Sequence, residues 1–589
     1  MDSTIYDSTN SFSSILSVEA VSTNEIRTSE NIDSVDEVGT NGLDSQHPKV
    51  SVKINGLTAT LDNGLINISF DSHATVSSLY ANDQNRVENV AVGETFYLDW
   101  HNGTFNHFSP NSLEVISESA KHAHIMYLQD SPGFLKLEYH LIIKRGLSGI
   151  YTYVKSTNNQ DHLLTFGELR VIYRFNPKAT HQVTNSIQQG ILPDSSVLTN
   201  DTLVQDTTWR LKDGTIYTKY DYAGYIRNSP YLGVFGDGYG AWLLSASREY
   251  HSGGALKQDL LVHQDALIAN YMTGAHFGTP ELKAPVGWSK IYGPWLLYFN
   301  EGTDDEMKED AIRQVKVEQD LWPYKWMHET DYPLKRGSLT GRITGPPRSM
   351  VVLSSSLKEE FDLQTLGYSY SIETNENGDF QLENIRPGIY KLTAYPIAGY
   401  GIGFQAEKQI TVTAGANRAT LNLVVPTKVK WSIGETNRRS DSYRYSDKPR
   451  NYIWHTLPPA NLEFYIGKSD IHTDWYYAQT KPGTWNIRYT DTVDGQNRIL
   501  RIGIAAASNG GPTYPGIPTF AVSVNDHLMN EFHYDNDKSI YRSASQSGSF
   551  YFQNIKIPSN LVITGDNVVS LTLRDGMFMY DSINLSSDE

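Results

Sequence analysis

Residues 136–156 read KLEYHLIIKRGLSGIYTYVKS, in which two runs of alternating apolar and polar residues flank a short break. Successive side chains of a strand point to opposite faces, so this alternation is typical of two antiparallel strands joined by a turn. Runs of the same kind, broken by Gly, Asn, Asp and Pro, continue from about Ser51 to about residue 333. The pattern predicts a large antiparallel β-domain over residues 51–333.

One segment of this domain departs from the strand pattern. It reads TDDEMKEDAIRQVKVEQDLW, with Thr303 and Glu306 in the spacing of a capping box. Apolar side chains then recur at helical intervals, at Met307, Ala311, Ile312 and Val315. We expect a single helix that closes the domain near Trp322.

Two smaller β-domains follow. In residues 334–424, Asn377-Gly378 and Arg386-Pro387-Gly388 mark turns between apolar runs, which predicts a small sandwich. Residues 425–589 alternate again, in runs such as TWNIRYTDT and RILRIGIAAAS, and are long enough for a jelly-roll sandwich of the kind that carries carbohydrate-binding modules. The fold class is therefore all-β.

Residues 1–50 differ from the rest, with nine Asp or Glu against two Lys or Arg. This segment has too few apolar side chains to order itself, and we interpret it as a disordered acidic leader. Its first ten residues, MDSTIYDSTN, lack the basic and apolar regions of a signal peptide.

The composition excludes several classes of function. The net charge of −17 argues against a nucleic-acid partner, because such binding depends on Lys and Arg neutralising phosphates. The chain has no Cys, so disulfides, thiolate metal sites and a cysteine nucleophile are excluded. No apolar run reaches the ~18 residues of a membrane span, so we expect no membrane partner.

Lys219 is the first candidate for chemistry. The period-two reading of residues 217–222, YTKYDY, puts Tyr217, Lys219 and Asp221 on one face of a strand. Neighbouring aromatic rings disfavour the charged form of a lysine and depress its pKa. The alternative is an ordinary solvated strand lysine.

The other candidates surround it in sequence. His276 follows the apolar run LIANYM, between Gly274 and Gly278, and is either a functional or a structural histidine. Arg170 and Arg174, four residues apart beside Glu168, are suited to binding a carboxylate but could equally form a cross-strand ion pair. The pair Gly253-Gly254 indicates either a close approach to a ligand or a hairpin turn.

The order of these segments resembles that of the rhamnogalacturonan lyase family. The runs TKYDYAGYI, GGALKQDLLVH and NYMTGAHFG resemble the family's core, TNENGDFQLENIRPGIYKLTAY resembles its fibronectin-III-like domain, and WSIGE, TWNIRY and MYDSINL resemble its carbohydrate-binding-like domain. The resemblance spans about residues 50–589 and implies a first domain with a mutarotase-like β-sandwich, the supersandwich fold. Where family members often have Gly-Gly-Pro, this chain has Gly253-Gly254-Ala255.

The resemblance also implies an activity. Enzymes of this family cleave the galacturonate–rhamnose backbone of pectin, rhamnogalacturonan I, by β-elimination and leave a 4,5-unsaturated uronate. It implies an extracellular enzyme, which we expect to be monomeric, and no required cofactor or catalytic metal. A structural calcium ion in the C-terminal domain stays open, because the acidic residues Asp474, Asp566 and Asp581 have no diagnostic spacing.

Residue roles follow from the matching motifs. Lys219 matches the catalytic lysine and is assigned as base, and His276 matches the catalytic histidine and is assigned as acid, with the reverse still open. Arg174 resembles the arginine that meets the uronate carboxylate, and Arg170 either assists it or pairs with Glu168. The remaining candidates for substrate contact are Tyr217, Tyr222, Tyr271, Gly253 and Gly254.

Three other readings stay open at this point. A noncatalytic wall-binding protein would have the same architecture. A pectin-directed glycoside hydrolase would need two carboxylates about 5 Å or about 6.5–9.5 Å apart, and no such pair is evident between Arg170 and His276. A mutarotase-like epimerase would leave the two appended sandwiches unexplained.

Overall fold

The computed structural model describes residues 47–587, except for 91–93, 447–456, 512–513 and 543–545. The predicted leader lies outside the described residues apart from 47–50. Val50 is already buried, and its N–H donates to the carbonyl of Ala120 at 3.2 Å, so packing of the first domain begins just before Ser51. Within the described ranges, no helix is long and apolar enough to cross a membrane.

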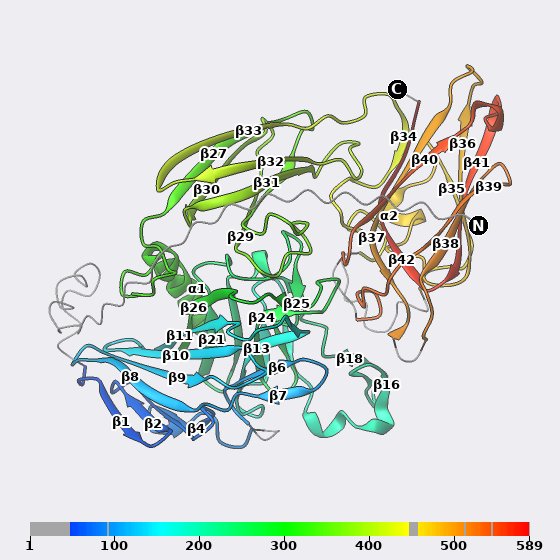
Figure 1. Ribbon diagram of the computed structural model, residues 1–589. Helices are drawn as coiled ribbons and strands as arrows, with labels where there is room; N and C mark the ends of the chain where they lie inside the picture. Colours follow the sequence, from blue (N-terminus) through cyan, green and yellow to red (C-terminus); the bar gives the residue numbers. More distant parts are fainter. Residues whose placement is uncertain (1–46, 91–93, 447–456, 512–513, 543–545, 588–589) are drawn as a thin grey trace. The chain divides into compact units, whose positions relative to one another are not determined.

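The first domain is built around a large antiparallel sheet, part of which Figure 1 shows where β8, β9, β10 and β11 are labelled. Its strands lie in the spatial order β15 (Gln189–Ile191), β14 (Gln182–Thr184), β20 (Tyr231–Gly236), β21 (Tyr239–Leu244), β26 (Ser289–Glu301), β11 (Gly149–Thr157), β10 (Lys136–Lys144), β9 (His122–Gln129) and β8 (Ser112–Glu118). β10 and β11 pair from Lys136↔Thr157 to Ile143↔Ile150. The hairpin predicted from residues 136–156 is confirmed.

Two further sheets complete the core of this domain. One runs β1 (Ser51–Asn55), β2 (Thr58–Asp62), β3 (Ile66–Phe70), β4 (Val76–Ala81) and β5 (Gln84–Asn85). The other, which we call the site sheet, runs β23 (Val262–His263), β24 (Leu267–Gly274), β13 (Glu168–Arg174), β6 (Tyr97–His101) and β7 (Phe105–His107). Side chains from all three sheets share one apolar core, which holds the site sheet rigidly from behind.

Short strands frame the site sheet. They form the pairs β12 (Leu164–Phe166) with β25 (Leu282–Ala284) and β19 (Gly224–Tyr225) with β22 (Gln258–Asp259), and the ribbon β16 (Leu203–Gln205), β17 (Thr208–Arg210) and β18 (Ile216–Thr218). β18 ends at Thr218, and residues 219–222 form turns, with the N–H of Asp221 donating to the carbonyl of Thr218. The expectation that Tyr217, Lys219 and Asp221 share one strand face is therefore wrong, because the chain turns where the alternation was extended.

The predicted helix is α1 (Asp304–Leu321), with Thr303 and Glu306 making both capping-box hydrogen bonds and Trp322 as C-cap. Met307, Ala311 and Val315 are buried against β20, β21 and β26. Ile312 is 44% exposed, whereas Glu318 is buried. The carboxylate of Glu318 accepts hydrogen bonds from the hydroxyls of Tyr151 and Tyr324, which allows its burial and was not visible in the apolar pattern.

The second domain is a sandwich of two sheets around its own core. One sheet runs β30 (Asp379–Ile385), β27 (Gly337–Thr344) and β33 (Gly415–Asn422), and the other runs β29 (Ser369–Glu373), β28 (Ser349–Ser354), β31 (Gly388–Pro396) and β32 (Ala406–Val412). The predicted turn at Asn377-Gly378 lies between β29 and β30, where Gly378 has φ +81°. Positive φ of this kind is what glycine supplies at a turn.

The third domain is a second sandwich. One sheet runs β34 (Val429–Ile433), β42 (Met577–Ser587), β37 (Arg498–Ser508) and β40 (Tyr551–Ile557), and the other runs β35 (Leu462–Tyr465), β36 (Gly483–Asp491), β41 (Gly565–Asp575), β38 (Thr519–Val524) and β39 (His527–His533). Trp475 and Tyr477 are fully buried, so neither offers a surface for a sugar. Trp475 lies in the core between the sheets, where it packs edge-on against Trp485.

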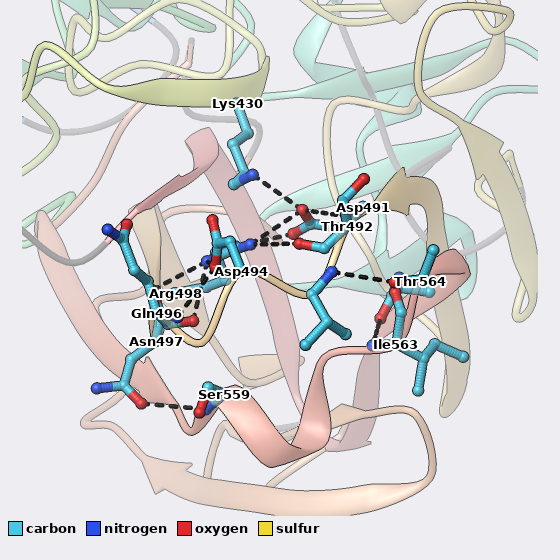
Figure 2. A network of polar contacts seen from close by, with 12 residues as sticks. Lys430, Asp491, Thr492, Asp494, Gln496, Asn497, Arg498, Ser559, Ile563 and Thr564 are labelled. Carbon is cyan, nitrogen blue, oxygen red and sulfur yellow. Dashed lines mark hydrogen bonds and ion pairs between the residues drawn. The ribbon is translucent and has the colours of Figure 1, made fainter.

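A buried ion network ties the β36–β37 connection to the start of β34 (Figure 2). The guanidinium of Arg498, fully buried, donates to both carboxylate oxygens of Asp491 at 2.9 and 3.1 Å and to Asp494 at 2.9 Å. The ammonium of Lys430 donates to Asp491 at 2.8 Å. Burial opposes ionisation of Asp491, but the bonds from Arg498 and Lys430 outweigh it and lower the pKa of Asp491 to about 2.

The carboxylates that had suggested calcium lie in separate environments. Asp581 is buried, and one oxygen accepts from the N–H groups of Asn437, Arg438 and Arg439. Asp474 accepts from the N–H of Asp470, whereas Asp566 is exposed on β41. In the part of the chain that the structure describes, no three His, Asp or Glu side chains gather as metal ligands.

Candidate active site

The site begins with β13, whose side chains alternate between two environments. Leu169, Val171 and Tyr173 are buried in the core, whereas Arg170 and Arg174 point to the opposite face together with Glu168. The shared face predicted for the two arginines is confirmed. The same face carries a small apolar cluster beside these charged groups, made by Tyr97, Ile172, Tyr220, Ala223, Leu260, Leu267, Ala269, Tyr271 and Phe277.

Arg170 is held by its neighbours on both adjacent strands. Its Nε and Nη2 donate to the two oxygens of Asp99 at 2.7 and 2.9 Å, and its Nη1 donates to the hydroxyl of Tyr271 at 2.9 Å. Glu168 lies 3.1 Å from the same Nη1. Arg170 therefore forms the ion pair that was considered as its alternative role. Asp99 and Glu168 largely compensate the positive charge of Arg170.

Arg174 lies at the other end of the same strand face. Its guanidinium stands 5.3 Å from the ring centroid of Tyr97. The nearby imidazole of His263 is half-buried, and its desolvation together with the positive charges of Lys219, Arg170 and Arg174 lowers its pKa well below the usual value. Cationic side chains therefore converge on this face of the site sheet, in a protein whose net charge is strongly negative.

Lys219 reaches this region from the turn after β18. Its ammonium lies 5.3 Å from the ring centroid of Tyr220, and in the described ranges no side-chain hydrogen bond holds it. Burial is the main reason that the pKa of Lys219 is lowered, and the carboxylate of Asp206 opposes the shift. The guanidinium groups of Arg542 and Arg170 lower the pKa further. A lowered pKa makes the charged form of Lys219 less favourable than that of a solvated lysine.

His276 lies just beyond the end of β24, as the sequence predicted, and its side chain is 8% exposed. Its Nδ1 is 3.4 Å from Asp259 and its Nε2 is 3.5 Å from Glu168. Burial lowers the pKa of His276 below its usual value, although these two carboxylates oppose the shift. Hydrogen bonds of catalytic groups are often long before substrate binds, so both carboxylates are close enough to stabilise an imidazolium.

Lys219 and His276 belong to one electrostatic unit, because Glu168 and Arg542 act on the pKa of both. Arg542 comes from the third domain. Its guanidinium lies 3.0 Å from Asp206 and 5.3 Å from the ring of Tyr220, the residue next to Lys219. No motif in the sequence pointed to Arg542. Its place near the site follows from the packing of the third domain against the turn after β18.

Comparison with known proteins identifies the family. Two family models match, "Polysaccharide lyase family 4, domain II" over residues 343–420 and "Polysaccharide lyase family 4, domain III" over residues 429–585. A rhamnogalacturonate lyase from Dickeya dadantii is 44% identical over 547 residues, which cover 91% of this chain and 94% of the relative. The chain belongs to polysaccharide lyase family 4.

More distant similarities are weaker. A probable rhamnogalacturonate lyase B from Aspergillus flavus is 23% identical over 75% of this chain and 78% of the relative. Among solved structures, a galactose mutarotase related enzyme from Lactobacillus acidophilus is 10% identical and covers 42% of this chain and 98% of its own, with a TM-score of 0.25. The family predicted from the motif order is confirmed.

The aromatic candidates of this lyase occupy different places. Tyr271 lies in the site, hydrogen-bonded to Arg170 and 5.3 Å from the ring of His276. Tyr217 is buried in the core, where its hydroxyl donates to the side chain of Gln264 and accepts from its N–H. Tyr222 is half-buried, with its hydroxyl beside Gly190. Substrate contact for Tyr217 would require the core to open.

The two glycines lie at the junction with the second domain of the lyase. The N–H of Gly253, at φ +82°, donates to the carbonyl of Gln364 at 2.7 Å. A Cβ on Gly254 would stand 2.9 Å from the Cα of Asp362 and 3.0 Å from the ring of Phe361. Close packing of the second domain accounts for both glycines without a ligand.

Proposed function

We propose that this family 4 polysaccharide lyase cleaves rhamnogalacturonan I, the galacturonate–rhamnose backbone of pectin, by β-elimination. One observation carries the proposal: a lysine with a lowered pKa and a histidine flanked by carboxylates face the same cationic region of the site sheet. Elimination next to a carboxylate requires a base, an acid and positive charge, and the site supplies all three.

The steps follow from these groups. Positive charge from Arg174 and Arg542 stabilises the galacturonate carboxylate as the C5 proton becomes acidic. The neutral amine of Lys219 takes this proton, and the electron pair of the C5–H bond forms the C4=C5 double bond as the C4–O4 bond breaks. His276, as imidazolium, gives its Nε2 proton to O4 of the departing rhamnosyl chain. The reverse assignment of Lys219 and His276 is the runner-up.

Hydrolysis is less well supported by the same geometry. The carboxylates nearest His276 are Glu168, which lies 3.1 Å from Arg170, and Asp259, which lies 3.2 Å from Lys257. A hydrolase needs one carboxyl group with a raised pKa as acid and a second as base or nucleophile. Each of these two carboxylates instead forms an ion pair with a cationic side chain.

Further properties belong to the same proposal. Arg174, Lys219 and Arg542 supply the positive charge for elimination, so activity should persist after dialysis against a chelator. A polymer of the plant cell wall is the substrate, so the enzyme acts outside the cell that makes it. We expect it to act as a monomer, because the site is assembled within one chain.

The test is the ultraviolet absorbance of the unsaturated uronate, followed while the protein is mixed separately with rhamnogalacturonan and with homogalacturonan. We expect a rise with rhamnogalacturonan alone. New reducing ends without absorbance would indicate a hydrolase, and neither signal would indicate a wall-binding protein.

A further inference from the structure

A buried lysine and a buried aspartate lie behind His276, on the side away from Glu168. The ammonium of Lys257 is 3.2 Å from Asp259 Oδ2, and Asp259 Oδ1 is 3.4 Å from His276 Nδ1. The side chains of Lys257 and Asp259 are 4% and 1% exposed. Neither can reach solvent or substrate, and the chemistry described above uses neither.

The same lysine also holds the backbone that carries His276. Its ammonium donates to the carbonyl of Gly274 at 2.8 Å, at the end of β24 and two residues before the histidine. Space at this point is tight, since a Cβ on Gly274 would lie 2.9 Å from Asp259 and 2.8 Å from the ring of Tyr271. Lys257 therefore links the strand end, Asp259 and the imidazole in one contiguous set of contacts.

We propose that Lys257 and Asp259 are positioning residues that hold His276 protonated at Nδ1 and direct its Nε2 toward the leaving oxygen. The proposal rests on the proposed function, in which His276 is the acid. A carboxylate at Nδ1 fixes the orientation of an imidazole and stabilises its charged form. Lys257 pairs with Asp259 and compensates its negative charge in a fully buried place.

The charged groups that face His276 come from several elements. Asp259 on β22 and Glu168 on β13 raise the pKa of His276, whereas burial and the distant charge of Arg542 lower it. Glu168 is shared with Arg170 at 3.1 Å. Asp259 is therefore the carboxylate whose removal should most directly lower the pKa of His276 and move the pH optimum to lower pH.

The test compares two leaving groups. The natural rhamnosyl oxygen needs a proton to depart, whereas 4-nitrophenol at O4 of a galacturonate oligosaccharide departs as a stabilised anion. In Asp259→Asn we expect kcat on the natural polymer to fall about 10²–10³-fold with little change in KM, as for loss of acid assistance. On the nitrophenyl substrate, the loss should be under about threefold.

Two further variants complete the comparison. His276→Ala should also lose much activity on the natural polymer and little on the nitrophenyl substrate, because it removes the acid itself. Lys257→Met should show the same selective loss, because Asp259 would then lie buried without its ionic partner. Lys290→Met is the matched control, since Lys290 is also buried and donates to a backbone carbonyl, that of Thr365 at 3.2 Å, outside the site. It should leave both rates unchanged.

The outcomes distinguish the positioning role of Asp259 from the acid role of His276. Equal losses on both substrates in Asp259→Asn, beside a selective loss in His276→Ala, would overturn the positioning role and leave the acid role of His276 intact. Equal losses in His276→Ala itself would overturn the proposed roles and the positioning role with them. If Asp259→Asn does not fold, as judged by circular dichroism, Lys257→Met decides by the same comparison.

Discussion

Arg542 of the third domain and Asp206 of the first form an ion pair of 3.0 Å beside the turn that carries Lys219. The guanidinium also stands 5.3 Å from the ring of Tyr220. A domain whose family model describes it as CBM-like therefore contributes a charge to the candidate active site. Arg542 lowers the pKa of both Lys219 and His276, so the third domain acts electrostatically on the two residues proposed as base and acid.

Arg542→Gln should raise the pKa of both groups and shift the pH optimum to higher pH. Less of Lys219 would then be a free amine at neutral pH, so kcat should fall, by about tenfold for each unit by which the pKa rises. Steady-state rates across pH measure this. Arg574→Gln is the control, because Arg574 lies on β41 with its side chain 57% exposed. An unchanged pH profile in Arg542→Gln would contradict the coupling.

Lys219→Arg should abolish activity even though it keeps the positive charge. A guanidinium stays protonated at any working pH and cannot act as a base, so kcat should fall by at least about 10²-fold. Oligosaccharide binding, measured by calorimetry, should change little. Retained turnover would show instead that Lys219 serves only to bind the carboxylate.

Glu249→Gln should destabilise the junction between the first and second domains. Glu249 is buried and accepts from Arg336 at 2.8 Å, Arg386 at 2.7 Å and Tyr370 at 2.7 Å. Removing one partner of a buried ion pair typically costs about 3–5 kcal/mol, because the other charges stay buried. Thermal unfolding measures the loss. Asp379→Asn, which breaks an exposed pair with Arg342, should have little effect.

Asp491→Asn should weaken the third domain at neutral pH but not in strong acid. The pKa of Asp491 is lowered to about 2 in the folded protein, so its contribution is fully present above the unfolded pKa of about 3.9 and is lost as pH falls toward 2. The difference in unfolding temperature between wild type and variant should therefore shrink between pH 4 and pH 2. A difference independent of pH would contradict the role given to the Asp491 charge.

The β-strands and the single long helix were predictable because each has a local periodicity. The alternation in residues 136–156 predicted the β10–β11 hairpin, and Thr303 with Glu306 predicted the start of α1. The same local rule failed at Lys219. Alternation there extends past Thr218, but the backbone turns to bring the lysine toward the site, which depends on contacts with Thr207 and Asp221 rather than on period.

The candidate site was predictable only in part. Lys219, His276 and Arg174 came from motif order, and the structure brings them to one sheet face and its border. Asp259 and Lys257 lie in the quoted run GGALKQD but had no visible role, because their partner His276 is distant in sequence. Tyr217 was a candidate for substrate contact because of its aromatic ring, but it is buried in the core of the first domain.

The most direct test of the central claim is the mass of the products of a defined rhamnogalacturonan oligosaccharide. Elimination splits the chain without adding water, so the masses of the two fragments should sum to that of the substrate, and one fragment should carry the unsaturated uronate. Fragments whose masses sum to the substrate plus one water would show hydrolysis and would contradict the roles assigned to Lys219 and His276.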